Sequence, residues 1–287
     1  MINEVLNPPA VDVPRILFGD LASRTVHAKI VCTQSGILAG VEALESGAKV
    51  LGLRTAIQAP SGTRVIPGSI VAVVLGNPLQ IVRGEDALLG IISKVSGVAT
   101  AAHAAVRRAG RIRVVCGGWK KMPATLKHEL RDALKVGGLD SRIAPGPFLY
   151  LDKNYVRIFG SIAGALNAAG RLPGRTVCIQ IRGETAPVAE EAIVAAKGGA
   201  RVVMVDTGRV EDLREVSAAL VRLGLRKQTE IAFAGSIALN DLERLRDEDV
   251  DIVDVGRAIL DAPLLDFRYD VFDIGVGNNG LSPAWQD

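Results

Sequence analysis

The chain has 287 residues, enough for two domains or for one barrel with a cap. Apolar residues make up 48% of it and aromatic residues only 4%, which predicts a large aliphatic core of the kind found where helices cover parallel strands. The net charge is +3 with both signs interspersed, which argues against a nucleic-acid-binding protein and is compatible with anionic small molecules as ligands.

Three widely spaced cysteines lie in apolar runs: Cys32, Cys116 and Cys178. We interpret them as buried free thiols in a reducing compartment, and no Cys or His spacing typical of a metal site is present. The N-terminus lacks the pattern of a signal peptide. Uninterrupted apolar stretches are shorter than the ~20 residues that cross a bilayer. The sequence therefore predicts a cytoplasmic protein with no membrane partner.

The first part of the chain mixes short strands and turns. Apolar, β-branched spacing predicts strands at residues 27–33 and 48–53. Between them, residues 36–45 are predicted to form a helix, with Ser35 as its N-cap.

A turn-rich stretch at residues 61–68 leads into an apolar, β-branched run at 69–75, which predicts another strand. Apolar residues at helical spacing then continue from about residue 79 to residue 109. Gly110 is the expected C-cap of this long helix.

Beyond residue 111 the pattern changes to short aliphatic runs, each followed by a turn and mostly by helical spacing. The runs are residues 112–116, 148–151, 176–181, 201–205, 230–233 and 251–255. This alternation predicts βαβ units and a parallel sheet. With about six such units and right-handed crossovers, we favour closure into a barrel over an open sheet.

In a βα barrel the chemistry lies just after the C-terminal ends of the strands. Here these positions combine cations, carboxylates and glycine turns that let backbone N–H groups approach a phosphate. They include Trp119, Lys120, Asp152, Lys153, Arg182, Asp206, Gly235, Ser236, Gly256 and Arg257. The pattern indicates a polyanion site, while ordinary solvated loops with turn glycines explain it equally well.

Segments spread over nearly the whole chain resemble one known family in their order and spacing. They are residues 19–24, 35–40, 62–68, 96–100 and 113–162, Asp206, Ala234-Gly235-Ser236 and Val255-Gly256. The family is that of the quinolinate phosphoribosyltransferases, or nicotinate-nucleotide pyrophosphorylases. The resemblance implies an α/β fold with an N-terminal α/β sandwich domain, residues 1–111, and a C-terminal parallel βα barrel of about six strands, residues 112–267. Residues 268–287 are a candidate addition to the first domain.

The resemblance also implies an activity: transfer of a phosphoribosyl group from phosphoribosyl pyrophosphate to the ring nitrogen of quinolinate with Mg²⁺, followed by loss of carbon dioxide. Such a site needs cations for its anionic substrates and carboxylates for Mg²⁺ and for the developing oxocarbenium charge. By resemblance, Lys120 and Asp206 are the candidate catalytic residues, and Asp206 is the candidate Mg²⁺ ligand. The candidate substrate-binding residues are Trp119, Arg142, Asp152, Lys153, Gly235, Ser236, Gly256 and Arg257.

Several positions depart from the family pattern. Asp86 and Trp119 stand where the family has arginine, and Ser141 replaces a histidine. Asp152 stands where the family has lysine, and Gln180 replaces an early barrel carboxylate. Because one like charge at ~4 Å costs several kcal/mol in a partly buried site, we expect quinolinate, with two carboxylates, to bind poorly.

Three hypotheses follow. The first is a phosphoribosyltransferase-like enzyme whose phosphorylated substrate is phosphoribosyl pyrophosphate or a related ribose phosphate and whose acceptor is not quinolinate. The second is a catalytically silent paralogue that binds a phosphorylated ligand or a partner. The third is a true quinolinate phosphoribosyltransferase with a rearranged pocket. In each case we expect a phosphate site at the turns Gly235-Ser236 and Gly256-Arg257.

We also predict a homodimer in which the N-terminal domain of one chain closes the barrel of its partner, an arrangement that the resemblance implies. Six strands fall short of the eight of a closed barrel. The run at residues 70–74 is apolar on both faces and needs a neighbour. Arg24 or Arg64 of one chain would then help to replace the lost cations of the other.

Overall fold

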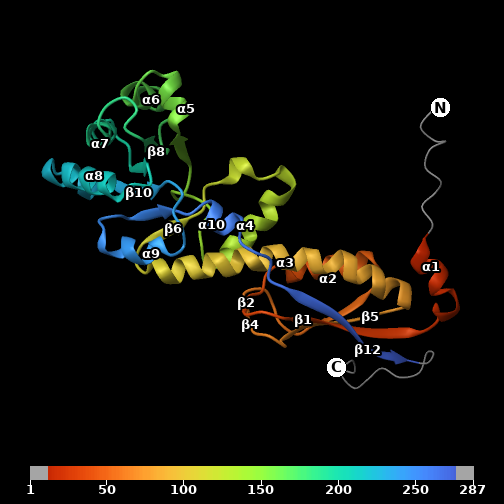
Figure 1. The fold of residues 1–287 in the computed structure, drawn as a ribbon. Helices are drawn as coiled ribbons and strands as arrows, with labels where there is room; N and C mark the ends of the chain where they lie inside the picture. Colours follow the sequence, from red (N-terminus) through yellow and green to blue (C-terminus); the bar gives the residue numbers. More distant parts are fainter. Residues whose placement is uncertain (1–11, 276–287) are drawn as a thin grey trace, which may run out of the picture. The chain divides into compact units, whose positions relative to one another are not determined.

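A computed structural model describes residues 12–275 (Figure 1). The chain forms two compact units, one of Met1–Gly97 with Pro263–Asp287 and one of Val98–Ala262. The predicted long helix is α3, Pro78–Ala109, and Gly110 follows it with a φ of +63°, as a left-handed C-cap requires. Because α3 contributes residues to both units, the division lies inside this helix and not at its end near residue 111.

The first unit is built on an antiparallel sheet in the order β12-β1-β5-β3. The strands are β1 Thr25–Cys32, β3 Arg54–Ile57, β5 Ile70–Gly76 and β12 Phe267–Gly275. The smaller elements are α1 Val13–Leu17, η1 Gly19–Leu21, β2 Gly36–Ile37, β4 Arg64–Val65 and α2 Val41–Val50. β12 pairs with β1 from end to end, with Thr25 opposite Gly275 and Cys32 opposite Phe267. Residues 267–275 therefore return to the first unit, while the rest of the segment 268–287 lies outside the described residues.

The core of this unit lies between the sheet and the helices α2 and α3, which cover one face of it (Figure 1). Val71 and Val74 of β5 are fully buried in this core, together with Leu44 of α2 and Leu88 of α3. Most of the apolar run at 70–74 is thus covered by the chain itself.

Two local predictions in this unit are wrong. Residues 48–53 do not form a strand, because Leu44 and Ala48 share one buried helical face and α2 continues to Val50. The helix is capped by Gly40, with a φ of +81°, and not by Ser35. A Cβ at Gly40 would lie 2.8 Å from a methyl group of Val95, so packing against α3 decides where α2 begins.

The second unit holds a parallel sheet in the order β6-β11-β10-β9-β8-β7. Its strands are β6 Arg113–Val115, β7 Phe148–Leu151, β8 Thr176–Ile181, β9 Val202–Asp206, β10 Glu230–Ala234 and β11 Ile252–Asp254. All six lie where the sequence predicts them. The sheet curls into a half-barrel, with β6 and β7 at its edges and an isolated bridge from Val115 of β6 to Asp140. The predicted fold class is confirmed, although the strands do not pair into a closed ring.

Helical segments join the strands of this second sheet. The α-helices are α4 Lys127–Val136, α5 Lys153–Ile158, α6 Ile162–Ala169, α7 Val188–Lys197, α8 Val210–Arg222, α9 Asp241–Arg244 and α10 Arg257–Leu260. The 3₁₀ turns are η2 Trp119–Lys121, η3 Ala124–Leu126, η4 Arg226–Gln228 and η5 Leu245–Asp247. On the inner side of the sheet, Val115, Met204 and Ala234 form an apolar cluster with Ile143 and Phe148.

By length and composition alone, α3 is long and apolar enough to cross a membrane, with a mean hydropathy of 1.3 in its most apolar window. The sequence prediction considered only uninterrupted apolar runs and missed this window. Half of the window is buried inside the structure, as in the core helix of a soluble protein.

Candidate active site

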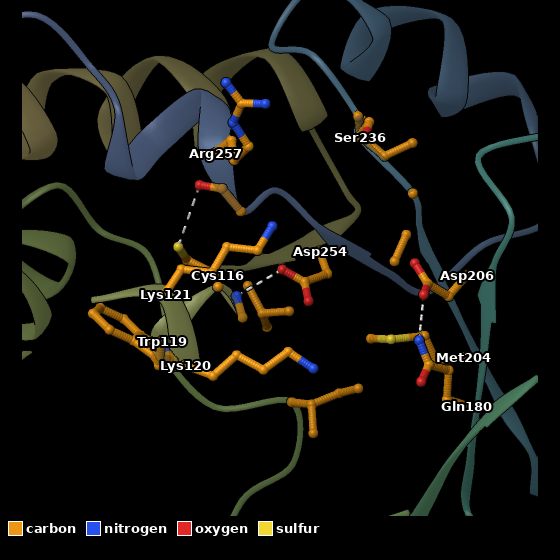
Figure 2. A pocket seen from close by; sticks show the side chains of 18 of the residues that line it. Cys116, Trp119, Lys120, Lys121, Gln180, Met204, Asp206, Ser236, Asp254 and Arg257 are labelled. Atoms are coloured by element: carbon orange, nitrogen blue, oxygen red, sulfur yellow. Dashed lines mark hydrogen bonds between the residues drawn. The ribbon is translucent and has the colours of Figure 1, made fainter. Parts of the chain in front are cut away.

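A cavity of about 740 Å³ opens where the barrel strands end (Figure 2). Its floor is apolar and aromatic, since Ile143, Phe148, Tyr150 and Met204 all line it. Eight of the residues predicted from the sequence line its walls: Trp119, Lys120, Asp152, Asp206, Gly235, Ser236, Gly256 and Arg257. The parallel topology brings these residues together, because the carboxyl ends of the strands share one edge.

Two other predicted substrate-binding residues are not among those lining the cavity. The guanidinium of Arg142 lies 5.0 Å from the ring centre of Phe148 and donates to the carbonyl of Gly146. Lys153 begins α5, and its backbone N–H donates to Oε1 of Gln180 at 2.7 Å. Arg142 therefore packs against the ring of the floor residue Phe148, and Lys153 contributes a backbone contact at the cavity wall.

Asp152 is held by two kinds of contact. Its carboxylate caps α5, accepting from the backbone N–H of Asn154 at 2.9 Å and from that of Tyr155. Its other oxygen lies 3.6 Å from Nζ of Lys120. Asp152, which stands where the family has lysine, thus places a carboxylate in the cavity wall, partly neutralised by Lys120.

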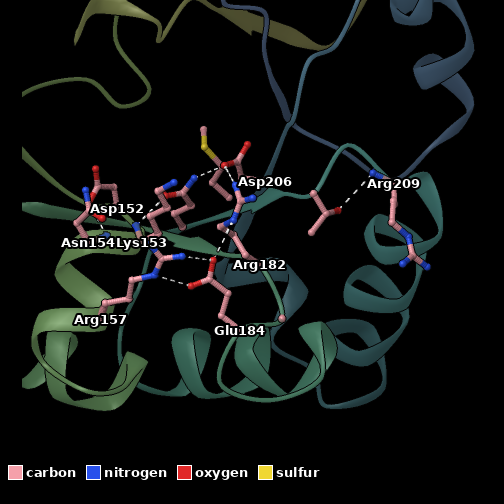
Figure 3. Close-up of polar contacts among 12 residues, drawn as sticks. Asp152, Lys153, Asn154, Arg157, Arg182, Glu184, Asp206 and Arg209 are labelled. Carbon is pink, nitrogen blue, oxygen red and sulfur yellow. Dashed lines mark hydrogen bonds and ion pairs between the residues drawn. The ribbon is translucent and has the colours of Figure 1, made fainter. Parts of the chain in front are cut away.

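Asp206 ends β9 and is the inner member of a chain of charges (Figure 3). Its Oδ2 accepts from the side-chain amide of Gln180 and from Arg182 at 2.5 Å. Arg182 also lies 3.3 Å from Glu184, which forms a two-point ion pair with Arg157 at 2.9 and 2.8 Å. The hydrogen bonds from Arg157 hold the pKa of Glu184 below its ordinary value. Asp206 is therefore engaged by groups of the chain itself.

The loop that carries Arg182 is organised by Glu191, a buried carboxylate of α7 that the sequence analysis did not single out. Glu191 accepts from the backbone N–H groups of Arg182, Gly183 and Thr185 at 3.0, 2.8 and 2.8 Å. It also accepts from the hydroxyl of Thr185 at 2.8 Å. The loop at residues 182–185 is thus tied to α7, and it directs Arg182 toward Asp206.

Asp254, at the end of β11, is a cavity residue that the sequence analysis missed. Burial raises the pKa of Asp254 to about 6, against a backbone hydrogen bond from Gly117 that lowers it, and the charge of Asp206 adds to the rise. The N–H of Gly117 donates to Asp254 at 2.7 Å. The available signal was position: Asp254 lies two residues before Gly256, at the end of a predicted strand.

Tyr150 is a second missed cavity residue, since it lies inside a predicted strand and not after one. Its hydroxyl donates to the sulfur of Met204 at 2.9 Å. Burial raises the pKa of Tyr150 well above its ordinary value, and the carboxylates Asp254, Asp206 and Asp152 raise it further. Tyr150 therefore stays protonated and offers the cavity a neutral aromatic face.

The cysteines are free and buried, as predicted. Burial raises the pKa of the Cys116 thiol to about 12, and the charge of Asp254 adds to this rise. Cys116 lines the cavity beside the carbonyl of Gly256. It therefore remains a thiol at neutral pH and does not serve as a nucleophile.

The turn after β10 is held in an unusual backbone conformation. Gly235 has a φ of +119° and Ser236 a φ of +60°. A Cβ at Gly235 would lie 2.3 Å from the backbone nitrogen of Gly208, in the neighbouring turn after β9. Only glycine permits this close approach of two loops. The predicted phosphate site at this turn and at Gly256-Arg257 stays a prediction.

The donor atoms for Mg²⁺ are few. In the described residues, no group of three or more His, Cys, Asp or Glu side chains is placed to hold a metal ion. Mg²⁺ commonly binds through one or two carboxylates completed by substrate phosphates and water. Asp206 fits that mode, because its hydrogen bonds from Gln180 and Arg182 both fall on Oδ2 and its Oδ1 accepts no hydrogen bond from the described part of the chain.

Comparison with known proteins gives matches to both halves of the chain. The model of the quinolinate phosphoribosyl transferase C-terminal domain matches residues 98–270, and that of the N-terminal domain matches residues 13–96. The probable carboxylating nicotinate-nucleotide pyrophosphorylase of Archaeoglobus fulgidus is 28% identical over 260 residues, covering 88% of this chain and 98% of that protein. The human carboxylating nicotinate-nucleotide pyrophosphorylase is 26% identical over 266 residues, covering 91% and 88%.

Solved structures show the same fold. The nicotinate-nucleotide pyrophosphorylase of Pyrococcus furiosus superposes with a TM-score of 0.77 at 24% identity, covering 93% of this chain and 75% of that one. The Francisella tularensis nicotinate-nucleotide pyrophosphorylase superposes with a TM-score of 0.76 at 20% identity, covering 91% and 96%.

Proposed function

Because the chain belongs to the quinolinate phosphoribosyl transferase family, we propose that it transfers a phosphoribosyl group from phosphoribosyl pyrophosphate to an acceptor less anionic than quinolinate. The resemblance found in the sequence is confirmed by the match to both domains. Its relatives are named as nicotinate-nucleotide pyrophosphorylases, which are pentosyltransferases, and this chain is an enzyme of that class.

The charge lining the cavity is the observation that carries the acceptor proposal. Three cations line it: Lys120, Lys121 and Arg257. Four carboxylates line it as well: Asp152, Asp206, Asp254 and Asp261. Two of these cations already have carboxylate partners, Lys120 with Asp152 at 3.6 Å and Arg257 with Asp261 at 3.1 Å. Among the cations that line the cavity in the described residues, Lys121 alone has no carboxylate partner, so a dianionic pyridine finds few free cations and a neutral ring is the better fit.

The floor of the cavity supports a planar acceptor. Phe148 and Tyr150 contribute aromatic rings, and Ile143 and Met204 contribute apolar surface. Trp119 lines the same cavity. The guanidinium of Arg131, on α4, lies 4.9 Å from the centre of the Trp119 ring. Apolar and aromatic walls with few polar groups are typical of sites for small aromatic molecules.

The turns on the other side of the cavity support the sugar phosphate. The backbone N–H groups at Gly235-Ser236 and Gly256-Arg257 suit a terminal phosphate, with the guanidinium of Arg257 beside them. Lys120 would neutralise the pyrophosphate. Asp206 would hold Mg²⁺ together with substrate phosphates, and the ion would stabilise the negative charge of the leaving pyrophosphate.

The first test is direct turnover. The pure protein is incubated with phosphoribosyl pyrophosphate, Mg²⁺ and quinolinate, and nicotinate mononucleotide is measured. We expect formation at the background rate. Clear formation of nicotinate mononucleotide overturns the acceptor proposal and favours a true quinolinate enzyme with a rearranged pocket.

The second test examines the donor site. Phosphoribosyl pyrophosphate with Mg²⁺ is expected to raise the Tm of the wild-type protein, and Lys120→Ala to weaken its binding by roughly tenfold, because a charge-assisted contact contributes about 1.5 kcal/mol or more. Lys197→Ala is the control, since Lys197 is an exposed residue at the end of α7 and does not line the cavity. Equal binding by the two variants contradicts the assignment of Lys120.

One observation favours the silent paralogue as a second candidate. Asp206, the residue proposed for Mg²⁺, is already paired with Arg182 at 2.5 Å. A protein that binds phosphoribosyl pyrophosphate but releases no pyrophosphate with any acceptor would fit this candidate. Arg182→Ala distinguishes the silent paralogue from the enzyme. In the silent paralogue, removal of Arg182 frees Asp206 and raises the affinity for Mg²⁺ but produces no turnover.

A further inference from the structure

We propose that Asp254 receives a proton from the acceptor, and that the acceptor is an aromatic heterocycle with a ring N–H. This inference rests on the proposed phosphoribosyl transfer and names the class of acceptor. It makes Asp254 a catalytic residue, in contact with the substrate.

The first support is the way the chain is shaped around this carboxylate. Asp254 projects from the end of β11 into the cavity, and one oxygen accepts the backbone N–H of Gly117 at 2.7 Å (Figure 2). A Cβ at Gly117 would lie 2.2 Å from the other oxygen. A side chain at residue 117 would therefore displace the carboxylate, so the loop after β6 accommodates Asp254 only because it carries glycine there.

The second support is the lack of a cationic partner. Each of the other three carboxylates in the cavity has one: Asp152 with Lys120, Asp206 with Arg182, and Asp261 with Arg257. In the part of the chain that the structure describes, no ion pair is formed by Asp254. A buried carboxylate without a counter-charge is costly, and such a group at the centre of a cavity is a natural proton acceptor.

The charged and titratable groups around Asp254 come from every wall of the cavity. They are Cys116 after β6, Lys120 and Lys121 in η2, Tyr150 in β7, Asp152 before α5, Asp206 in β9, and Arg257 and Asp261 at α10. Burial and the charge of Asp206 raise the pKa of Asp254 to about 6, while that of Cys116 rises to about 12 and that of Tyr150 also rises. Among these three groups, Asp254 alone has a pKa near neutrality.

The step is balanced as follows. One ring nitrogen of the acceptor attacks C1 of the ribose with its lone pair. The bond from C1 to the pyrophosphate oxygen breaks, and its electrons leave with pyrophosphate. The N–H proton on the other ring nitrogen passes to the carboxylate of Asp254, which gives a neutral N-ribosyl product. A base with a pKa close to the working pH is effective in such a transfer.

This chemistry also separates the acceptor from quinolinate. A pyridine nitrogen attacks with its lone pair and has no ring proton to lose, so a base opposite it has nothing to accept. A ring N–H heterocycle need not carry a carboxylate, which suits a cavity whose wall holds four carboxylates and in which two of the three lining cations are already paired. The acceptor class and the presence of Asp254 thus have a common explanation.

The test uses benzimidazole and purine as ring N–H probes, with 1-methylbenzimidazole as the analogue that has no ring N–H. Pyrophosphate release is measured with phosphoribosyl pyrophosphate and Mg²⁺, and probe binding is followed by thermal shift. We expect release with at least one ring N–H probe and none above background with the methylated analogue.

Asp254→Asn is the informative variant, because the amide oxygen still accepts the N–H of Gly117 while the base is lost. We expect pyrophosphate release to fall by roughly 10²- to 10⁴-fold with little change in the KM for phosphoribosyl pyrophosphate. In the wild type the rate rises with pH as the carboxylate of Asp254 ionises and then levels, and in the variant this rise is absent. Asp247→Asn, at an exposed position in η5 outside the cavity lining, is the control.

Three results overturn the inference: an Asp254→Asn variant with wild-type rate and pH profile, equal turnover of the methylated analogue, or no binding of either ring N–H probe while phosphoribosyl pyrophosphate still binds. In the last case the proposed function survives with a different acceptor. Failure of phosphoribosyl pyrophosphate itself to bind overturns the proposed function as well.

Discussion

At the scale of single residues, the carboxylates of the cavity differ in what compensates their charge. Asp152 and Asp206 have cationic partners, whereas Asp254 has one backbone N–H and is largely buried. Burial moves the pKa of Asp254 from the ordinary value of 3.8 to about 6. Because folding raises its pKa, protonated Asp254 makes its full contribution to stability only below the unfolded-state pKa. This contribution is lost as the pH rises through about 6.

Asp254→Asn is therefore expected to stabilise the protein more at pH 8 than at pH 5. The cost of keeping the ionised group folded is at most ~3 kcal/mol at pH 8, at about 1.4 kcal/mol per pKa unit, and the neutral amide does not carry it. Urea unfolding at the two pH values measures the difference. Asp247→Asn is the control, because Asp247 is exposed and does not line the cavity; its effect on stability should not differ between the two pH values. An equal effect of Asp254→Asn at both pH values contradicts the prediction.

At the scale of elements, the loops after the strands owe their shape to contacts with other segments. Glu191 on α7 ties the loop after β8, and the glycine turns after β9 and β10 touch one another. Each contact sets the direction of a side chain or a backbone N–H that faces the cavity.

Glu191→Ala is expected to lower the free energy of unfolding by about 2–4 kcal/mol, because three backbone N–H groups and one hydroxyl lose their buried acceptor. Glu190→Ala is the matched control, since Glu190 lies in the same first turn of α7 but is exposed. Both variants lose the same favourable interaction with the helix dipole. Equal losses from the two variants, measured by denaturant unfolding, would show that Glu191 does not organise the loop.

Gly235→Ala tests the contact between the two turns. The new Cβ would lie 2.3 Å from the backbone nitrogen of Gly208, so we expect a loss of several kcal/mol together with weaker binding of phosphoribosyl pyrophosphate. Gly224→Ala is the control, because Gly224 also has a positive φ, +69°, but open space around it. That control should cost only about 1 kcal/mol, the price of the left-handed conformation. Similar losses for both variants contradict the role of the contact.

At the scale of the whole molecule, the half-barrel sheet leaves β6 and β7 as edges, and the edge strand β12 exposes three large apolar side chains. Val271, Phe272 and Ile274 are 50%, 53% and 55% exposed. The run at residues 70–74, which the sequence analysis expected to need a neighbour, is mostly covered by the chain's own helices. The exposed apolar side chains of β12 are therefore the stronger reason to expect association.

The homodimer predicted from the sequence stays a prediction. Light scattering at micromolar concentration is expected to give twice the 30.2 kDa mass of one chain. Phe272→Lys should shift the mass toward the monomer if the exposed side chains of β12 take part. A wild-type mass of one chain contradicts the prediction.

The sequence by itself determined the order of the elements and most of the bounds in the second unit. The strands β7 and β8 and the long helix α3 agree closely with their predicted ranges. Apolar periods of 2 and 3.6 residues are local, so they survive in the sequence. Because parallel strands end at one edge, the positions after them also predicted most of the cavity wall.

Only the tertiary structure decided which of these side chains face the cavity and how each charge is compensated. Arg142 packs against the ring of Phe148, and Asp254 contacts Gly117, which is 137 residues away in the chain. β12 likewise finds β1 across more than 200 residues, and Val95 of α3 sets the start of α2 at Gly40. Pairings of this kind depend on strand order and on packing between distant segments, and neither has a local period in the sequence.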